Sequence, residues 1–518
     1  MKKLLLIGVV IGLFTACNEP KFDESSTMYL KSGNGKAVGQ NPITFSFLSK
    51  YDIGGEGAAE ISAFDPLTKK LFVVDNSETS QIVVLDLTNP GSPLDAGAID
   101  VSGYGGGVNS VAVKNGMLAA AIEADPKTDD GVVVVFNTET QFEIQKVGVG
   151  ALPDMVTFTP DGNYILSANE GEPNFDYTID PIGSVSVISV ADWSVTPLYF
   201  SSFAVQQDAL MAKGFRIFGL NATFEQDIEP EYITVSEDSK TAWVSLQENN
   251  ALAKVDIENK TITELLPLGF KDYSRPQNTI DVSDEDDVYM PDRWPVYGIY
   301  EPDGIAVMTE NGIPYVFTAN EGDSRDYQDE DLDTVYFVEE ARVKDIDLDP
   351  EIFPDADLLQ KKTMMGRLKI TTTLGNTDND GEYEELYSYG ARSFSVWDGN
   401  TGDQIFDSRD ELDIQAVING LYDDGRSDDK SIEPEATVVG SIGNVKLLFV
   451  GMERANSVAV YDVTNPGNPK YLQWLSTGAG PEGVIFVPAE ESPSGENLLI
   501  VSSEVDGVVT IFNVKKEI

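Results

Sequence analysis

Carboxylate and amide side chains recur at two fixed places in a repeating pattern along this chain. An Asp, Glu or Asn opens a short apolar segment, and roughly fifteen to twenty residues later another Asn or Glu closes the next apolar segment. The opening set is Glu60, Asn109, Asp154, Glu231, Asp303, Glu435 and Glu482, and the closing set is Asn76, Glu123, Glu170, Glu248, Glu321, Glu453 and Glu504. Side-chain oxygens of this kind are the ligands that calcium and magnesium prefer. The pattern therefore indicates binding of divalent cations.

Other catalytic and metal chemistries lack the side chains that they need. The chain has no histidine and a single cysteine, Cys17. A Ser-His-Asp triad, a histidine general base and a histidine-containing zinc site are therefore excluded. If lipid is attached to Cys17, no thiol nucleophile or thiolate metal ligand remains. We expect calcium, or else magnesium, and no zinc, haem or nucleotide cofactor.

The spacing of apolar residues around the carboxylates predicts β-hairpins. The second and fourth residues after each opening residue are mostly apolar, as in Ile233 and Val235 after Glu231, and a period of two is that of a strand. A turn, such as Pro-Asp-Gly at 160–162, and a second apolar run follow. In an antiparallel hairpin the start of the first strand and the end of the second lie at the same edge. Both sets of carboxylates are therefore expected on one face.

Two further apolar runs follow most hairpins, so each repeat supplies four strands. Repeats of about 40 to 50 residues are typical of solenoids and propellers, and seven of them predict an all-β, seven-bladed β-propeller over residues 43–518. The last repeat lacks a fourth strand, and the unpaired segment 43–48 is expected to complete it, which protects the sheet edges. Insertions are expected at about 201–230, 268–300 and 322–390, the last being a long acidic insertion in blade five.

The first 42 residues have the pattern of an exported, lipid-anchored protein. Residues 1–16 contain a basic start, an apolar run from 4 to 14 and small residues before Cys17, and they resemble a bacterial lipoprotein signal peptide. Cleavage before Cys17 and its lipidation would leave 17–42 as a polar, flexible tether. The apolar run is too short to span a bilayer. We therefore expect a bacterial cell-envelope protein, held at the outer membrane or cell surface by a lipid anchor alone.

The charge of the chain limits its partners. Asp and Glu number 87 against 35 Lys and Arg, which gives a formal charge of −52. Such a chain repels nucleic acid, so no nucleic-acid partner is expected. An acid-coated surface suited to saline conditions explains part of the excess. Runs as dense as 323–357, however, either stay disordered or are neutralised by hard cations with oxygen ligands.

One segment has the spacing of a calcium loop. Asn376, Asp378 and Asp380 place oxygen side chains at alternate positions, and Gly381 follows where such loops turn sharply. Tyr387 stands where an EF-hand needs a bidentate Glu, and no flanking helices are evident, so the segment is not an EF-hand. It predicts a shorter calcium loop, and the alternative is an Asn/Asp/Gly hairpin turn.

An Ala-Asn-Glu-Gly segment occurs twice, at 168–171 and 319–322, and each time another acid, Glu172 or Asp323, follows the glycine. Either the motif is structural, with Gly at a turn of positive φ, or it is a ligand group for calcium or magnesium. The predicted metal ligands are Asp154, Glu170, Glu172, Glu231, Glu248, Asp303, Glu321, Asp323, Glu435, Glu453, Glu482, Glu504, Asn376, Asp378 and Asp380.

Three segments of the chain resemble the choice-of-anchor I family of bacterial surface proteins. They are Leu152–Met155 with Ser167–Pro173, Thr318–Asp323, and Tyr389–Ser395. That family is similar to mesenchyme-specific cell-surface glycoproteins and to an atypical bacterial alkaline phosphatase. The resemblance covers the chain from about residue 43 to its end. It implies the propeller and a means of anchoring that varies among members, and it assigns no catalytic residue.

Two functions are consistent with these residues. In the first, calcium held by the carboxylates polarises a phosphate ester and activates a water, with Glu321, Arg392 and Arg454 as candidate catalytic residues. The protein would then be a metal-dependent, alkaline phosphatase-like phosphomonoesterase. In the second, the acidic face binds calcium without catalysis and meets a glycan, mineral or protein partner at the cell surface. The abundance of carboxylates favours calcium binding over any named reaction.

Overall fold

The computed structural model describes residues 43–329 and 334–516. The predicted signal peptide, the lipidation of Cys17 and the tether lie outside the described residues. Residues 44–515 form one compact unit, in which the sheets lie. Among the described residues, no helix has the length and apolar character needed to cross a membrane.

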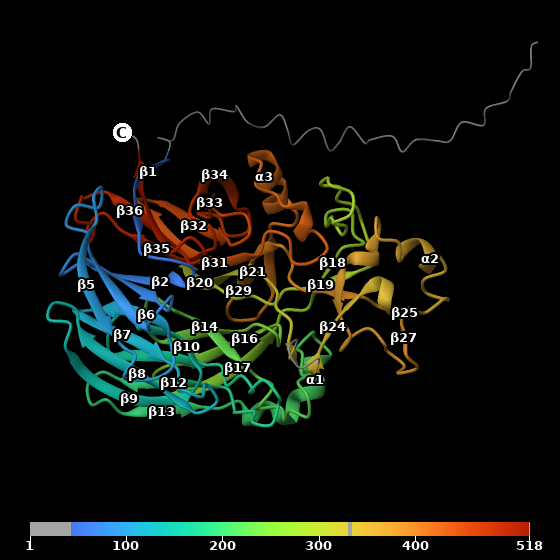
Figure 1. The fold of residues 1–518 in the computed structure, drawn as a ribbon, viewed down its shortest axis with the longest axis horizontal. Coiled ribbons are helices and arrows are strands. Elements are labelled where there is room, and N and C mark those ends of the chain that lie inside the picture. Colours follow the sequence, from blue (N-terminus) through green and yellow to red (C-terminus); the bar gives the residue numbers. More distant parts are fainter. Residues whose placement is uncertain (1–42, 330–333, 517–518) are drawn as a thin grey trace, which may run out of the picture. The chain divides into compact units, whose positions relative to one another are not determined.

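Four-stranded sheets built from antiparallel hairpins make up most of the described chain (Figure 1). The first contains β2 (Ala58–Asp65), β3 (Lys70–Asp75), β4 (Gln81–Asp86) and β5 (Leu94–Asp100). The second contains β6 (Val108–Lys114), β7 (Met117–Ile122), β8 (Asp130–Asn137) and β9 (Glu143–Ala151). The third contains β10 (Pro153–Phe158), β11 (Tyr164–Asn169), β12 (Ser184–Ser189) and β13 (Val195–Leu198). The fourth contains β14 (Pro230–Val235), β15 (Thr241–Leu246), β16 (Ala251–Asp256) and β17 (Thr261–Pro267).

Three more sheets follow, and the last one includes the first strand of the chain. The fifth contains β20 (Ile305–Glu310), β21 (Ile313–Asn320), β29 (Ser393–Asp398) and β30 (Gln404–Asp407). The sixth contains β31 (Pro434–Ile442), β32 (Val445–Met452), β33 (Ser457–Asp462) and β34 (Lys470–Ser476). The seventh contains β35 (Pro481–Val487), β36 (Asn497–Ser503), β37 (Val508–Lys516) and β1 (Ile43–Asp52). The predicted all-β fold is confirmed, and β1 lies beside β37, where the unpaired segment was expected.

The first strands of the sheets contact one another in chain order. β2 contacts β6, and the contacts continue through β10, β14, β20 and β31 to β35, which contacts β2 again. This circular arrangement of sheets around their first strands is that of a β-propeller. Because opening residues stand at the start of these first strands, the fold brings them toward a common centre.

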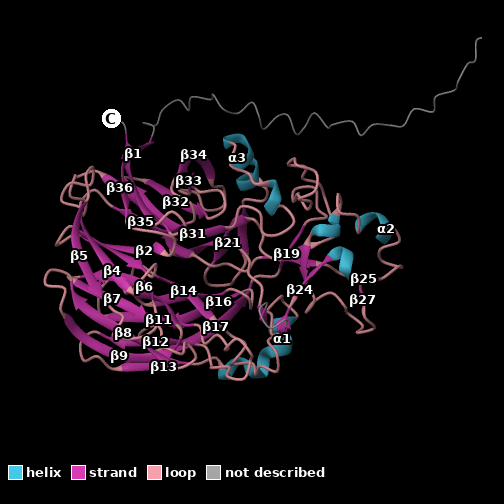
Figure 2. Cartoon of the chain, viewed as in Figure 1, coloured by secondary structure: helices cyan, strands magenta, loops and turns pink. Residues whose placement is uncertain are grey.

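Residues 321–392 separate β21 from its neighbour β29 and form short strands and helices (Figure 2). The strand pairs are β22 (Asp326–Asp329) with β23 (Thr334–Val338), β24 (Glu340–Arg342) with β26 (Lys369–Thr371), and β25 (Asp347–Leu348) with β27 (Glu382–Tyr383). The helices are α2 (Ala356–Leu359) and 3-10 turns at Val343–Asp345 and Met365–Arg367. β28 (Tyr387–Ser388) pairs with β19 (Tyr297–Ile299), which pairs with β18 (Phe270–Asp272). The segments around 268–300 and 322–390 therefore fold together, and they share an apolar core that includes Tyr273, Val343 and Met365.

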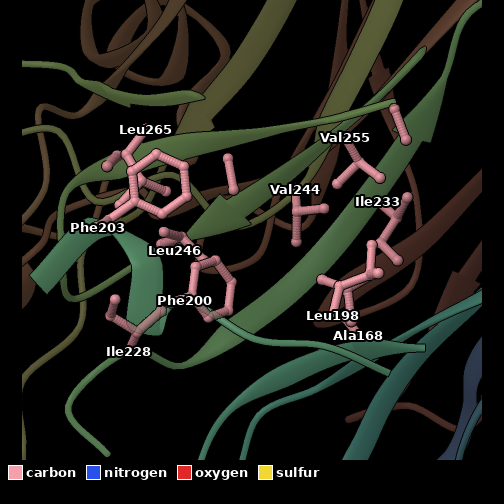
Figure 3. Packing of buried hydrophobic residues seen from close by; sticks show 14 of the residues in the cluster. Ala168, Leu198, Phe200, Phe203, Ile228, Ile233, Val244, Leu246, Val255 and Leu265 are labelled. Atoms are coloured by element: carbon pink, nitrogen blue, oxygen red, sulfur yellow. The ribbon is translucent and has the colours of Figure 1, made fainter. Parts of the chain in front are cut away.

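Two other connections carry helices. A 3-10 turn at Ser201–Gln206 and helix α1 (Gln207–Met211) follow β13, while α3 (Glu411–Asn419) and a 3-10 turn at Asp424–Arg426 lie between β30 and β31. Figure 3 shows Phe200 and Phe203, which precede α1, beside Leu246 and Leu265 of the fourth sheet. This apolar contact seats the connection on the sheet.

Two buried arginines join the connections to one another. The ion pairs are those of Arg216 with Glu301 and Glu339, and of Arg325 with Asp227 and Glu229. The ring of Phe218 lies 4.0 Å from the Arg216 guanidinium and 4.5 Å from that of Arg325, measured to the ring centroid. Because each arginine is the positive partner of two buried carboxylates, replacing the arginine would leave both acids uncompensated, at a cost of about 3–5 kcal/mol.

We predict that Gly322→Ala destabilises the chain more than Gly312→Ala. Both glycines have positive φ, +89° and +81°, but a Cβ at Gly322 would lie 2.1 Å from the Gly390 nitrogen, whereas nothing lies within 4 Å of a Cβ at Gly312. Gly312→Ala should cost about 1 kcal/mol from backbone strain alone. The free energies of unfolding measured in denaturant would test this, and equal losses for the two variants would contradict it.

Candidate functional site

A β-bulge stands at the opening acid in most first strands. The register of the hairpin shifts around Glu60, Asn109, Asp154, Glu231, Glu435 and Glu482. Proline immediately precedes five opening acids, namely Asp154, Glu231, Asp303, Glu435 and Glu482. Proline cannot donate to the ladder and is tolerated at the first residue of a strand or at a bulge. A bulge re-aims the side chain beside it, so the local sequence directs these acids away from the regular strand faces.

Opening and closing residues of a sheet meet, as the hairpin geometry requires. The Asn76 Nδ2 donates to Glu60 Oε2 at 3.1 Å and to the Val108 carbonyl at 2.9 Å. The second contact reaches the next sheet, since Val108 begins β6. The Asn109 Nδ2 likewise donates to the Pro153 carbonyl, at 3.1 Å, at the start of the third sheet. The opening and closing residues of the sheets are called the carboxylate ring below. In the first two sheets, therefore, amides of this ring contact main-chain carbonyls of the neighbouring sheet.

The first strands enclose a cavity of about 320 Å³. Asp154, Asp303 and Glu482 line it together with Tyr232, and the rest of the lining includes apolar residues such as Val111 and polar ones such as Asn109. Burial, reinforced by Glu172 and Glu123, raises the pKa of Asp154 to about 7. Burial also raises the pKa of Glu482, and charges on Glu504, Glu60, Asp303 and Asp154 add to that rise. Carboxylates of several sheets thus repel one another around this cavity.

Three groups of carboxylates on the ring could each hold one cation. The groups are Glu170 with Glu231 and Glu248, Asp303 with Glu321 and Glu435, and Glu321 with Glu433 and Glu453. Within each group, one oxygen of every residue lies within 4.8 Å of the others. The structure thus brings together eight acids from sheets three to six, seven of which were predicted as metal ligands. Glu433 was not predicted.

Basic side chains neutralise the groups around Glu321. The Lys430 Nζ lies 2.8 Å from Glu321 Oε1, 3.6 Å from Glu433 Oε2 and 3.8 Å from Asp323 Oδ1. Glu433 also forms ion pairs with Arg426 and Arg454. These positive charges hold the pKa of Glu433 below its usual value despite burial. A lysine ammonium therefore already occupies the position between Glu321 and Glu433 that a cation would need.

A sequence signal for Glu433 exists in the Glu-Pro-acid segments that begin at 229, 301 and 433. In each, the first Glu is buried and forms an ion pair with an arginine, while the acid after Pro is the opening residue of a sheet. Two of these glutamates, Glu301 and Glu433, have positive φ values of 40° and 48°. Such a backbone is uncommon for a residue with a side chain. This backbone conformation directs the two acids apart, so that the first forms an ion pair with an arginine and the second lies among the carboxylates of the ring.

The Asn of each Ala-Asn-Glu-Gly segment has a structural role. The Asn169 Nδ2 donates to the hydroxyls of Ser184 and Ser186, and Asn320 does the same with Ser393 and Ser395. The amide oxygens accept hydrogen bonds from the hydroxyls of Ser167 and Thr318. The asparagines therefore hold their strands to the neighbouring strand, and the glutamates that follow are left as the ligand candidates.

Glu172 and Asp323, the acids that directly follow the two Ala-Asn-Glu-Gly segments, have partners of their own. Glu172 forms an ion pair with Lys127 and accepts a hydrogen bond from the Tyr327 hydroxyl at 2.8 Å. The Asp323 carboxylate lies 3.8 Å from the Lys430 Nζ, and 53% of its side chain is exposed. Glu504 lies near Glu60 and Glu482, whose pKa values it raises. Among the described residues, none of these three acids belongs to a group of three carboxylates close enough to share an ion.

The two arginines predicted as catalytic have different surroundings. Arg392 is 2% exposed, and its guanidinium donates to the main-chain carbonyls of Asp281, Ser427 and Asp429 at 2.6–2.8 Å. It therefore tethers two connections and is not free to bind a phosphate. Arg454, with 42% of its side chain exposed, contacts Glu453 at 2.8 Å. Of the two, only Arg454 stands at the carboxylate ring with a surface open to solvent.

The loop 376–384 gathers a separate set of oxygens. Asp378, Asp380 and Glu384 place one carboxylate oxygen each within 4.8 Å of one another. The Asn376 Oδ1 and the Glu384 Oε1 are buried and have no hydrogen-bond partner. The other Glu384 oxygen accepts from the Thr377 nitrogen at 2.6 Å and hydroxyl at 2.7 Å, which closes the loop. Gly381 has φ of +101° at the turn. Sequence analysis missed Glu384 as a ligand, although it is the ninth residue from Asn376, where calcium loops often place one.

Comparisons with known proteins identify relatives of the chain. A family model described as the choice-of-anchor I domain matches residues 60–466. Gigasin-3a of Magallana gigas is 26% identical over 191 residues, which are 30% of this chain and 67% of gigasin-3a. The mesenchyme-specific cell surface glycoprotein of Strongylocentrotus purpuratus is 26% identical over 299 residues, which are 49% of this chain and 38% of the glycoprotein. This chain thus spans less than half the length of the glycoprotein.

Two solved structures are similar in outline. Hydrazine synthase of Kuenenia stuttgartiensis has a TM-score of 0.47 at 12% identity, with 90% of this chain and 98% of that chain covered. The Cps50 (Swd1) β-propeller domain of Myceliophteria thermophila has a TM-score of 0.45 at 9% identity, with 89% and 99% covered.

We predict that the chain without divalent cations loses stability as pH rises from about 5 to 7. Burial, together with neighbouring acids, raises the pKa of Glu60, Asp154 and Glu453 to about 7, whereas an unfolded carboxyl titrates near pH 4. Between these values the folded chain binds more protons than the unfolded chain, so stability is greatest at the acidic end and stays low above pH 7. Melting temperatures in chelator across this range would measure the trend, and a rise with pH would contradict it.

Proposed function

Because the chain belongs to the choice-of-anchor I domain family, we propose that it is a calcium-binding protein of the bacterial cell surface. Lipid at Cys17 would anchor it, and the seven sheets would be the blades of a seven-bladed propeller whose fifth blade carries the acidic insertion. The relative from Strongylocentrotus purpuratus is itself named as a cell surface protein, which supports this location.

The observation that carries the proposal is the oxygen set of the loop 376–384. Three carboxylates converge there, those of Asp378, Asp380 and Glu384, and two oxygens of the loop, Asn376 Oδ1 and Glu384 Oε1, are buried without partners. Calcium accepts six to eight oxygen ligands in flexible geometry, whereas magnesium demands a near-ideal octahedron. A flexible loop of carboxylate and amide oxygens therefore suits calcium better. Extracellular modules typically bind calcium at about 10⁻⁴ to 10⁻³ M, which fits carboxylates as exposed as Asp378 and Asp380.

Calcium in this loop would also stabilise the segment between β21 and β29. The loop leads into β27, which pairs in parallel with β25 through Glu382 and Tyr383. That pairing involves two residues of each strand, so it contributes little stability alone. An ion that neutralises Asp378, Asp380 and Glu384 would hold the loop in the conformation that presents β27 to β25. The result would be a calcium-dependent surface for a glycan, mineral or protein partner.

The phosphomonoesterase hypothesis has less support from the geometry. Arg392 donates to main-chain carbonyls, and Glu321 is occupied by Lys430 and by the Gln247 amide at 3.0 Å. Of the candidate catalytic residues, Arg454 alone combines solvent exposure with a place beside the carboxylates. One exposed arginine beside carboxylates is equally consistent with a binding surface and with catalysis.

We predict that Asp378→Asn combined with Asp380→Asn removes one calcium ion from the purified chain and abolishes part of the calcium-induced rise in melting temperature. Each substitution removes a charge but keeps an oxygen, so the effect reports on charge rather than on folding of the turn. Equilibrium dialysis and thermal unfolding with and without calcium would measure both changes. The matched control is Asp192→Asn, because the exposed Asp192 accepts from the Ser194 nitrogen in a similar turn but belongs to no carboxylate group. Unchanged calcium binding in the double variant would sink the proposal.

A second prediction separates binding from catalysis. We expect no calcium-stimulated hydrolysis of a generic phosphomonoester by the purified chain, because the arginines and Glu321 are engaged with protein groups. Product release would be followed with and without calcium, beside Glu321→Gln and Arg454→Ala. Calcium-stimulated turnover that both substitutions abolish would instead establish the hydrolase.

A further inference from the structure

The carboxylates of Glu170, Glu231 and Glu248 form a buried group without a positive partner. Glu170 directly follows β11, Glu231 is the second residue of β14 and Glu248 follows β15, and one oxygen of each lies within 4.8 Å of the other two. Within residues 43–329 and 334–516, no basic side chain forms an ion pair with any of them. In the two other groups on the ring, by contrast, Glu321 pairs with Lys430, and Glu433 pairs with Lys430, Arg426 and Arg454.

Burial makes the missing partner costly. Glu231 is 7% exposed and Glu248 5% exposed, and the Oε2 atom of each is buried with no hydrogen-bond partner. A buried carboxylate without compensation carries a large desolvation cost, so buried charges are normally paired or coordinate metals. Two unpartnered oxygens in one group of three carboxylates therefore point to a ligand with positive charge.

The guanidinium of Arg325, which acts on Glu248, is engaged by other acids. Arg325 is close enough to lower the pKa of Glu248 in part, but burial outweighs it and the pKa stays raised. Its nitrogens bond to Asp227 Oδ1 at 2.5 Å, to Glu229 Oε2 at 2.6 Å and to the Asp227 carbonyl at 3.0 Å. Asp227 and Glu229 together already exceed the charge of Arg325, so the surroundings of the three glutamates remain negative.

We propose that Glu170, Glu231 and Glu248 bind a second divalent cation, calcium in preference to magnesium, at a site independent of the loop 376–384. Calcium–oxygen distances of 2.3–2.6 Å allow the ligands of one ion to lie up to about 5 Å apart, and the three oxygens meet that condition. The ion would neutralise these three glutamates in the way that the Lys430 ammonium neutralises Glu321. It would bind a residue of the third sheet to two residues of the fourth, whose strands β11 and β14 are in contact.

The environment of the group is consistent with this assignment. Burial is the largest cause that raises the pKa of Glu231, followed by the charges of Glu248 and Glu170, and burial raises the pKa of Glu170 as well. An ion would remove this repulsion and hold all three residues in their charged form. Without it, the three acids compete with one another for protons.

The test uses the purified chain carrying Asp378→Asn and Asp380→Asn, so that the loop cannot bind calcium. Equilibrium dialysis against calcium should show one ion fewer when Glu231→Gln is added, and the same number when Glu60→Gln is added as the control, since Glu60 is the opening acid of the first sheet, accepts a hydrogen bond from Asn76 and belongs to none of the carboxylate groups among the described residues. An unchanged number of ions with Glu231→Gln would overturn the site. Failure of the loop proposal would be seen separately. In that case the chain with only the two loop substitutions would bind as many calcium ions as the unsubstituted chain.

Thermal unfolding gives a second, independent outcome. In chelator, Glu231→Gln should raise the melting temperature, because the substitution removes one of three repelling carboxylates. In saturating calcium the same substitution should lower the melting temperature, because the ion is lost. A decrease of the same size in both conditions would show a purely structural glutamate and overturn the proposal. If Glu231→Gln does not fold, Glu170→Gln serves in its place, since Glu170 is only partly buried.

Discussion

Repulsion among carboxylates that converge from different sheets is the constraint on which this structure depends. The circular packing of first strands places Asp154, Asp303 and Glu482 around one cavity, and the charges of Asp154 and Asp303 help to raise the pKa of both Glu482 and Glu231. Burial strengthens this repulsion, because charges interact more strongly where water is excluded. Every neighbouring feature of the site can be understood by how it offsets the repulsion: with an amide, with a basic side chain, or with a place for a cation.

The groups that offset the repulsion between carboxylates differ from sheet to sheet. Asn76 and Asn109 replace acids in the first two sheets and contact main-chain carbonyls of the next sheet. Lys430, Arg426 and Arg454 neutralise the acids between the fifth and sixth sheets. Between the third and fourth sheets neither device contacts Glu170, Glu231 or Glu248 in the described chain, and Glu231 Oε2 and Glu248 Oε2 are buried there without hydrogen-bond partners. The same repeat thus offsets the repulsion in different ways, and of the carboxylate groups found on the ring, the one between the third and fourth sheets is paired with no basic side chain.

The connections outside the sheets use charge differently. Arg216 and Arg325 are each held by two buried carboxylates and share the ring of Phe218. Glu229, Glu301 and Glu433 each take part in such an ion pair while the acid two residues later faces the ring. One short segment, Glu-Pro-acid, therefore anchors a connection with its first residue and supplies the ring with its last. This couples the stability of the connections to the geometry of the site.

The sequence by itself determined the strand periodicity, the repeat, the identity of the opening and closing acids and the absence of histidine chemistry, because these depend on residue type and local spacing. It also located the loop of Asn376, Asp378 and Asp380, whose ligands are close in the chain. Only the tertiary structure decided that Glu321 is neutralised and that Arg392 is engaged, because their partners are far away in the chain: Lys430 reaches Glu321 across 109 positions, and Arg392 donates to the carbonyl of Asp281 across 111. Pairings at such separations follow from how the connections pack over the sheets, which no local pattern encodes.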